Sequence, residues 1–233
     1  KVLKGAFSSG KEAILPRHVL VVSQFVFSIL LISATIIVYQ QIQHVKNRDM
    51  GYNPNNLLMI PSTPDTDKNY AAIKQELMGT GLISAVTRTS SPITELWWST
   101  GAPDYDGKPA NTQVIMGGLE TDVDFTKTMA IKMLQGRDFS GTPADSSSMI
   151  LNDAAVIAMG LKNPIGMKMR LWKDFTVIGV SGNVTISSPF EPAFPMLMLY
   201  NAASSRMTNI RFKNGVTPAT ALASIETIFK THN

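Results

Sequence analysis

The sequence predicts an α+β protein: a single transmembrane helix that continues as a helical stalk, followed by a bilobed extracytoplasmic domain. Three observations carry this prediction. Residues 19–38 form a run of twenty without one charged side chain. A strand-then-helix pattern occurs soon after this run and again near the C-terminal end. The stretch between the two occurrences is richer in Gly, Pro, Ser and Thr, which indicates an insertion of different character.

The uncharged run, VLVVSQFVFSILLISATIIV, has the length and composition of a transmembrane helix. At about 1.5 Å of rise per residue it spans about 30 Å, the thickness of the hydrocarbon core of a bilayer. A buried helix of a soluble domain is the alternative, but such helices usually carry a polar stripe. A removable signal peptide fits less well, because the run exceeds the usual ~7–15 residues. Tyr39 adds an interfacial ring, so we assign residues 19–39 to the membrane.

The charges are distributed unevenly about this run. The whole chain holds 21 basic and 17 acidic residues, and residues 1–18 contribute four of the basic ones and one of the acidic ones. By the positive-inside rule, residues 1–18 are a cytoplasmic basic segment and the main domain lies outside. That domain is nearly neutral and lacks the basic surplus that phosphate binding requires, so no nucleic acid is expected as a partner.

The membrane helix is predicted to continue into water as a stalk, residues 40–52. Tyr39, Ile42 and Val45 recur three residues apart, as on one stripe of a helix. A cluster of turn-forming residues at 51–55 then ends the helical pattern.

The strand-then-helix pattern predicts two related halves. Residues 57–60 and 82–89 are predicted strands flanking an amphipathic helix at 67–78, which makes one βαβ unit with parallel strands. Residues 208–212 alternate as in a strand, and Thr217 is positioned to cap a helix that has proline at its first position. The strand that would complete the second half is expected to follow the given sequence or to be lost.

The two halves are assigned to one lobe, residues 53–91 and 194–233, and the stretch between them, residues 92–193, to an inserted second lobe. An insertion leaves and rejoins its host lobe near one edge, which favours a bilobed domain. The elements predicted in the insertion are short strands at 112–116 and 175–180 and a helix at 153–159, capped by Asn152 or Asp153.

Enzyme chemistry has little support in the sequence. There is no G-x-x-x-x-G-K-S/T phosphate loop and no cysteine. Of the three histidines, His18 and His44 flank the membrane run and His232 lies at the terminus, so neither a catalytic triad nor a histidine zinc site is plausible. We therefore assign no catalytic residue, no cofactor and no metal site.

The alternating acids Glu120, Asp122 and Asp124 could present oxygens to calcium, but the glycine turn and the distal glutamate of a calcium loop are missing. A solvated acidic edge is the favoured interpretation. Trp97 and Trp98 are the candidates for contact with a partner, since tryptophan is enriched in interaction hot spots. Packing of at least one of them in the core is the favoured alternative.

With this layout in place, the sequence resembles the MacB-type, FtsX-like permease family of ABC transporters, in particular the two-repeat permeases of Bacteroidetes. The segments that carry the resemblance are RHVLVVSQFVFSILLISATIIVYQQIQHVKNRDMGYNPNNLLMI (17–60), MAIKMLQGRDFS (129–140), NDAAVIAMGLKNPIGMKM (152–169) and FTVIGVSGNV (175–184). Their order and spacing together are specific, although each piece alone is weak.

The resemblance implies a permease segment in a bacterial inner membrane, with its main domain in the periplasm. Such permeases couple ATP hydrolysis by an ABC ATPase subunit to motion of a periplasmic domain, which has a βαβ-containing Porter lobe and an inserted Sabre lobe. The implied partners are that ATPase, further membrane helices in a dimer or pseudo-dimer, membrane lipid, and a periplasmic adaptor or substrate. The family's substrates include peptides, lipoproteins, toxins and antibiotics.

The first residue is Lys and the later membrane helices of the family are missing, so the sequence is expected to be a piece of a longer protein. A membrane-anchored sensor that binds a ligand outside and feeds a cytoplasmic signalling domain is the alternative function. Further membrane spans downstream would favour the permease, and a cytoplasmic output domain upstream would favour the sensor. A membrane-tethered hydrolase is disfavoured by the missing catalytic residues.

Overall fold

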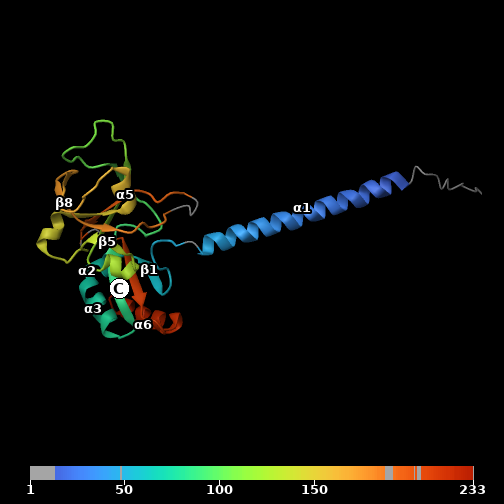
Figure 1. Cartoon of the computed structure of the whole chain (residues 1–233). Helices are drawn as coiled ribbons and strands as arrows, with labels where there is room; N and C mark the ends of the chain where they lie inside the picture. Colours follow the sequence, from blue (N-terminus) through green and yellow to red (C-terminus); the bar gives the residue numbers. More distant parts are fainter. Residues whose placement is uncertain (1–13, 48, 187–190, 202, 204–205, 233) are drawn as a thin grey trace, which may run out of the picture. The chain divides into compact units, whose positions relative to one another are not determined.

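The computed structural model describes residues 14–47, 49–186, 191–201, 203 and 206–232. Its internal contacts divide the chain into two units, Lys1–Arg48 and Asp49–Asn233. The described part of the first unit is the helix α1 (Ile14–Asn47), drawn in blue in Figure 1. Among the described residues, α1 is the one helix long and apolar enough to cross a membrane, over Pro16–Gln43.

Two hydroxyl groups of α1, those of Ser23 and Thr35, are satisfied within the helix. Ser23 donates to the carbonyl of Val19 at 2.5 Å, and Thr35 donates to that of Leu31 at 2.8 Å. This back-bonding to the preceding turn removes the cost of placing a hydroxyl in an apolar medium.

The helix ends at Asn47, so the prediction of a helical stalk over residues 40–52 was wrong at its C-terminal end. Asp49 accepts the N–H of Gly51 at 2.8 Å, and Gly51 has a φ of +74°. A side chain that bonds the backbone two residues ahead, together with a left-handed glycine, favours a turn over continued helix.

The second unit is built on one sheet. Its strands are β1 (Leu57–Pro61), β2 (Ile83–Thr89), β3 (Ser99–Gly101), β4 (Ile115–Thr121), β5 (Met133–Gly136), β6 (Ser148–Asn152), β7 (Lys168–Arg170), β8 (Asp174–Ser181), β9 (Met196–Tyr200) and β10 (Met207–Phe212). Its helices are α2 (Pro64–Lys68), α3 (Tyr70–Gly79), α4 (Phe125–Met129), the 3-10 helix η2 (Pro143–Ser147), α5 (Asp153–Ala158) and α6 (Pro218–Thr231). The strand order is β1-β10-β2-β4-β9-β6-β8-β5, with β3 beside β4 and β7 beside β8.

At one end of the sheet, β10 lies between β1 and β2 and is antiparallel to both. Leu58 pairs directly with Ile210, which confirms that the two sequence halves share a sheet. β1 and β2 are parallel to each other, as predicted, but they are separated by β10 rather than adjacent. Helices α3 and α6 pack together beside these strands (Figure 1). Their buried core consists of Ile73, Leu77, Ile83, Val86, Ile210, Phe212, Ala221 and Ile225.

The helix caps of this end follow the sequence signals. The Thr217 hydroxyl accepts the N–H of Thr220 at 3.3 Å and proline occupies the first turn of α6, as predicted. The helix predicted over residues 67–78 is instead broken at Asn69 into α2 and α3. Thr63 caps α2 with a reciprocal capping box, which starts the first helix earlier than the apolar pattern indicates.

The remaining strands form a larger end of the sheet. β2 meets β4 through a single residue pair, Thr89 with Thr121. β9, which the sequence boundary assigned to the segment 194–233, pairs instead with β4 and β6 from the segment 92–193. Four of its five residues are buried, so this apolar strand fits the interior of the larger end rather than an edge.

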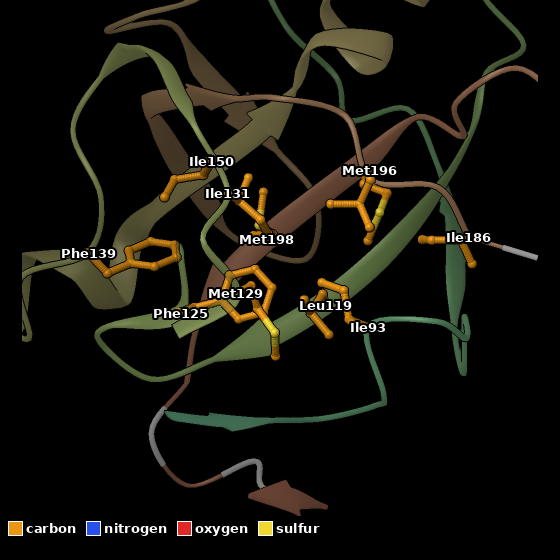
Figure 2. Packing of buried hydrophobic residues seen from close by; sticks show 11 residues of the cluster. Ile93, Leu119, Phe125, Met129, Ile131, Phe139, Ile150, Ile186, Met196 and Met198 are labelled. Carbon is orange, nitrogen blue, oxygen red and sulfur yellow. The ribbon is translucent and has the colours of Figure 1, made fainter. Parts of the chain in front are cut away.

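A second core joins the two ends of the sheet. Figure 2 shows its buried residues gathered around Phe125, Met129 and Leu119, and half-buried Leu57 and Met59 of β1 pack against it. A third core, which includes Met149, Met169, Phe175 and Leu197, lies within the larger end.

The strand predicted over residues 112–116 is in fact β4, which runs from Ile115 to Thr121. Gly117 and Gly118 hid its extent, because glycine pairs usually mark turns. In β4, however, the two glycines leave space into which the side chains of neighbouring residues pack. A Cβ on Gly117 would lie 2.5 Å from Leu96, and one on Gly118 would lie 1.9 Å from the Trp98 ring.

Candidate functional site

The tryptophan pair named from the sequence, Trp97 and Trp98, lies between β2 and β3. Trp98 is half-buried and packs against the core of the larger end, as predicted for at least one of the pair. Its indole lies against the backbone of β4 at Gly118, where any other residue would collide with the ring. Trp97, in contrast, is 46% exposed, so Trp98 contributes to the core and Trp97 to the surface.

The third tryptophan, Trp172, lies in the turn between β7 and β8 and was missed by the sequence reasoning. Its ring centroid is 6.4 Å from that of Trp98, and it packs edge-on against Phe175 at 5.5 Å. Trp172 is nevertheless 63% exposed. The sequence did contain a signal for Trp172, namely a large apolar ring in a short turn between the charged residues Arg170 and Asp174. The turn itself does not require such a ring.

The three tryptophans line two hollows that share Glu120 and Trp172, and we call the two together the tryptophan groove. The first hollow, of about 420 Å³, is lined by Ser90, Trp97, Trp98, Glu120, Trp172 and Arg206. The second, of about 480 Å³, shares Glu120 and Trp172 with the first and extends to Lys173, Tyr200 and Asn201. Both volumes lie in the range that is typical of ligand pockets, about 300–1,000 Å³.

Polar groups of both charge signs face the tryptophan groove. The Glu120 carboxylate accepts the amide of Asn201 at 3.1 Å. The Arg206 guanidinium lies 5.9 Å from the ring centroid of Trp97, within cation–π range. The indole N–H of Trp97 donates to Glu95 at 2.8 Å, so the polar edge of this ring already has a partner.

The chain connections explain why these residues meet. Ser90 directly follows β2, Arg206 directly precedes β10, and Glu120 belongs to β4. The tryptophan groove therefore lies where the smaller end of the sheet meets the larger one.

A second functional feature is the segment that follows α1, residues 49–55, which we call the post-helix segment. Met50 accepts the N–H of Thr185 at 2.9 Å, and Asn53 donates to the carbonyl of Met129 at 3.0 Å. A Cβ on Gly51 would lie 1.7 Å from the carbonyl oxygen of Asn183, so this backbone approach requires glycine.

Arg211 of β10 completes the attachment of the post-helix segment. Its guanidinium donates to the carbonyls of Asn55 at 2.8 Å, Asn53 at 2.6 Å and Thr128. Burial lowers the pKa of this half-buried guanidinium from its ordinary value. One side chain thus joins the post-helix segment, α4 and the central strand of the smaller end, and sequence reasoning gave it no role.

A comparison with protein families decides the identity of the fold. The profile of the MacB-like periplasmic core domain matches residues 19–228. The chain belongs to the MacB-like periplasmic core domain family. The resemblance drawn from the sequence is confirmed, and the chain is a MacB-like periplasmic core domain with an N-terminal apolar helix.

A solved structure shows the same fold at low sequence identity. The periplasmic region of MacB from Actinobacillus actinomycetemcomitans is 16% identical with a TM-score of 0.53, over 81% of this chain and 88% of that one. The extracellular domain of the noncanonic ABC-type transporter YknZ from Gram-positive bacteria is 12% identical with a TM-score of 0.46, over 72% of this chain and 86% of that one. Among curated proteins no sequence matches this chain.

The acidic residues of this MacB-like domain do not form the solvated edge that the sequence favoured. Asp122 is buried and accepts the N–H of Arg88 at 3.0 Å, the hydroxyl of Tyr70 at 2.7 Å and that of Thr87. Burial, followed by the charge and hydrogen bond of Asp122, raises the pKa of Tyr70 above its ordinary value, so the phenol remains a donor.

The other two acids have different surroundings. Asp124 accepts Lys74 at 3.3 Å, while Glu120 faces the tryptophan groove. Within the described ranges of the MacB-like domain and its helix, no three His, Cys, Asp or Glu side chains gather as metal ligands.

Proposed function

We propose that this chain couples ATP hydrolysis by a cytoplasmic ABC ATPase to motion of its periplasmic domain. The observation that carries the proposal is the attachment of the post-helix segment. Backbone hydrogen bonds, a glycine contact and Arg211 hold residues 50–55 to the domain immediately beyond α1. A helix followed by a held segment transmits displacement, whereas a flexible glycine linker would absorb it.

The proposed topology places residues 1–18 in the cytoplasm, residues 19–39 across a bacterial inner membrane, and residues 40–47 as the helical part of the stalk. The apolar composition of α1 and its satisfied hydroxyls support this arrangement. Further membrane helices of a permease, in a dimer or pseudo-dimer, complete the proposed assembly with the ATPase.

Within the periplasmic part, we assign residues 53–91 and the segment from 201 onward to a Porter-like lobe. Residues 92–193, now joined by β9, form the Sabre-like lobe. The single residue pair between β2 and β4 and the separate cores of the two ends of the sheet support this division.

The chain itself is proposed to be non-enzymatic. Its part in export or efflux is to contact a substrate or a periplasmic adaptor, and the tryptophan groove, with exposed Trp97 and half-buried Trp98, is the surface that we assign to this contact. Exposed aromatic rings beside an arginine are the composition of interaction hot spots.

The test of coupling inserts a flexible Gly-Ser segment between Gln43 and His44 of the full-length protein. Substrate export should fall severely, while folding and basal ATP hydrolysis stay close to those of the parent. The matched control carries the same insertion after Gly107, a turn glycine with open space around it. Undiminished export in the stalk variant would argue against transmission through α1, and equal loss in both variants would show a general effect of insertion.

A further inference from the structure

The tryptophan groove has two kinds of surface. Trp97 and Trp172 expose large parts of their rings, and Trp98 forms a half-buried floor held over Gly118. Exposed indole rings that the fold brings together from separate segments of the chain indicate a binding site. The ring of Trp172 is held by its edge contact with Phe175, so it is positioned before any ligand arrives.

The polar groups beside the rings are planar and carry opposite charges. Glu120 and Asn201 form one hydrogen-bonded pair at 3.1 Å, and each retains further lone pairs or N–H groups. Arg206 brings a guanidinium to the rim of the same hollow. A ligand that suits this site must therefore offer both donors and acceptors beside an apolar face.

Recognition of a peptide main chain is disfavoured here. A peptide bound by its backbone adds a strand to a free sheet edge. The strands that carry Glu120 and Tyr200, β4 and β9, pair with each other along Gly117–Thr121 and Met196–Tyr200, and each has another neighbour on its far side. Neither strand offers an edge to the groove.

We propose that the tryptophan groove binds a glycan with β-1,4-linked pyranose units. A pyranose ring with equatorial substituents has C–H groups on both faces, which stack on indole, and hydroxyls around its rim, each a donor and an acceptor for Glu120, Asn201 and Arg206. The two hollows, which share Glu120 and Trp172 in their linings, give room for more than one ring. This inference rests on the proposed binding role of the groove, but it does not depend on the coupling through α1.

The test uses the full 233-residue chain in a detergent without a sugar headgroup and follows its tryptophan fluorescence, excited selectively over tyrosine. All three tryptophans of the chain line the groove, so the emission reports on this site alone. The probes are cellotetraose and tetra-N-acetylchitotetraose, both uncharged. At least one of them should produce a saturable change in emission. Trp172→Ala should weaken that binding by about tenfold or more, measured by calorimetry because this variant loses a fluorophore.

The variants are chosen to keep the fold intact. Trp172 is 63% exposed, so its replacement leaves the core filled. The matched control, Ile157→Ala, removes a side chain that is 70% exposed on α5 and outside the groove lining, and should bind as the parent does.

Three results would contradict the proposal. Unchanged glycan affinity in Trp172→Ala would show that the glycan binds at another site. Binding of an uncharged apolar tetrapeptide, with no response to either saccharide, would keep the groove as a binding surface but overturn the glycan assignment. No response to any of these probes would remove the binding role of the groove as well, while leaving the stalk-insertion test of coupling unaffected.

Discussion

At the scale of single residues, Asp145 of η2 shows how a buried charge is held. Its carboxylate is fully buried and accepts the N–H groups of Ser140 at 2.6 Å and Gly141 at 2.8 Å, the Ser140 hydroxyl at 3.1 Å and Arg137 at 3.0 Å. Burial alone would raise the pKa of Asp145, but these donors outweigh it and hold the pKa below its ordinary value.

Replacing this carboxylate by an amide, Asp145→Asn, should lower the free energy of unfolding at pH 7 by about 1.5–3 kcal/mol, because hydrogen bonds to a charged group are lost. A depressed folded pKa means that the carboxylate stabilises the fold above its ordinary pKa of about 3.9 and loses that effect as the pH falls through the folded value. The difference between parent and variant, measured by chemical denaturation, should therefore narrow as the pH falls below the ordinary carboxyl pKa of about 3.9.

The control is Asp174→Asn, whose exposed carboxylate pairs with Arg170 at 2.8 Å and should contribute far less to stability, because solvent screens the pair. Equal effects of the two variants at pH 7 would contradict the role given to burial.

At the scale of elements, the post-helix segment depends on the shape of one side chain. Arg211 reaches three carbonyls because the guanidinium is a planar fork, whereas a lysine ammonium is a single point of charge. The conservative replacement is therefore not equivalent at this position.

Arg211→Lys should speed hydrogen exchange of the backbone amides in residues 49–55 and lower export, while ATP hydrolysis by the complex changes little. The expected loss of domain stability is about 1.5–3 kcal/mol, the range for hydrogen bonds to charged groups. Arg170→Lys, on an exposed arginine, is the matched control. Export at the parental level together with faster exchange would show that the attachment has no part in coupling.

The elements that sequence reasoning located best are those with local signals. The cap at Thr217 and the alternation in 208–212 are readable because neighbouring residues determine them. Partners of distant strands are not readable in this way. β9 was assigned to the wrong segment because nothing within an apolar run says which strands cover it, and Trp172 was missed because it meets Trp98 only in the folded chain.

At the scale of the whole molecule, the family and the division into an apolar helix and an α+β domain were predictable from composition and motif order. The burial of Asp122 was not predictable, because alternating acidic residues give the same sequence pattern whether a helix covers them or they are exposed to water. It is Tyr70 of α3, far away in the sequence, that covers this carboxylate.

The proposed topology predicts the effect of a charge in α1. Ile29→Asp should raise the cost of membrane insertion by about 2.5–3.5 kcal/mol. Because the chain has no cysteine, Asp106→Cys provides a unique label site for a membrane-impermeant maleimide added from outside. Labelling should be efficient in that background and fall when Ile29→Asp is added, whereas Ile29→Leu should leave it unchanged. Labelling only after the membrane is opened would reverse the assigned sides.

The position of β10 between β1 and β2 also governs when this domain can form during synthesis. The chain emerges N-terminus first, so β1 and β2 are made long before the strand that joins them, and both have unpaired edges in the interval. Pairing across such a long sequence separation is slow, and Arg211 reaches the post-helix segment only when β10 arrives. The attachment that the proposed motion needs is thus among the last contacts to be made, and a nascent chain stalled before residue 207 would be an aggregation-prone species that depends on chaperones.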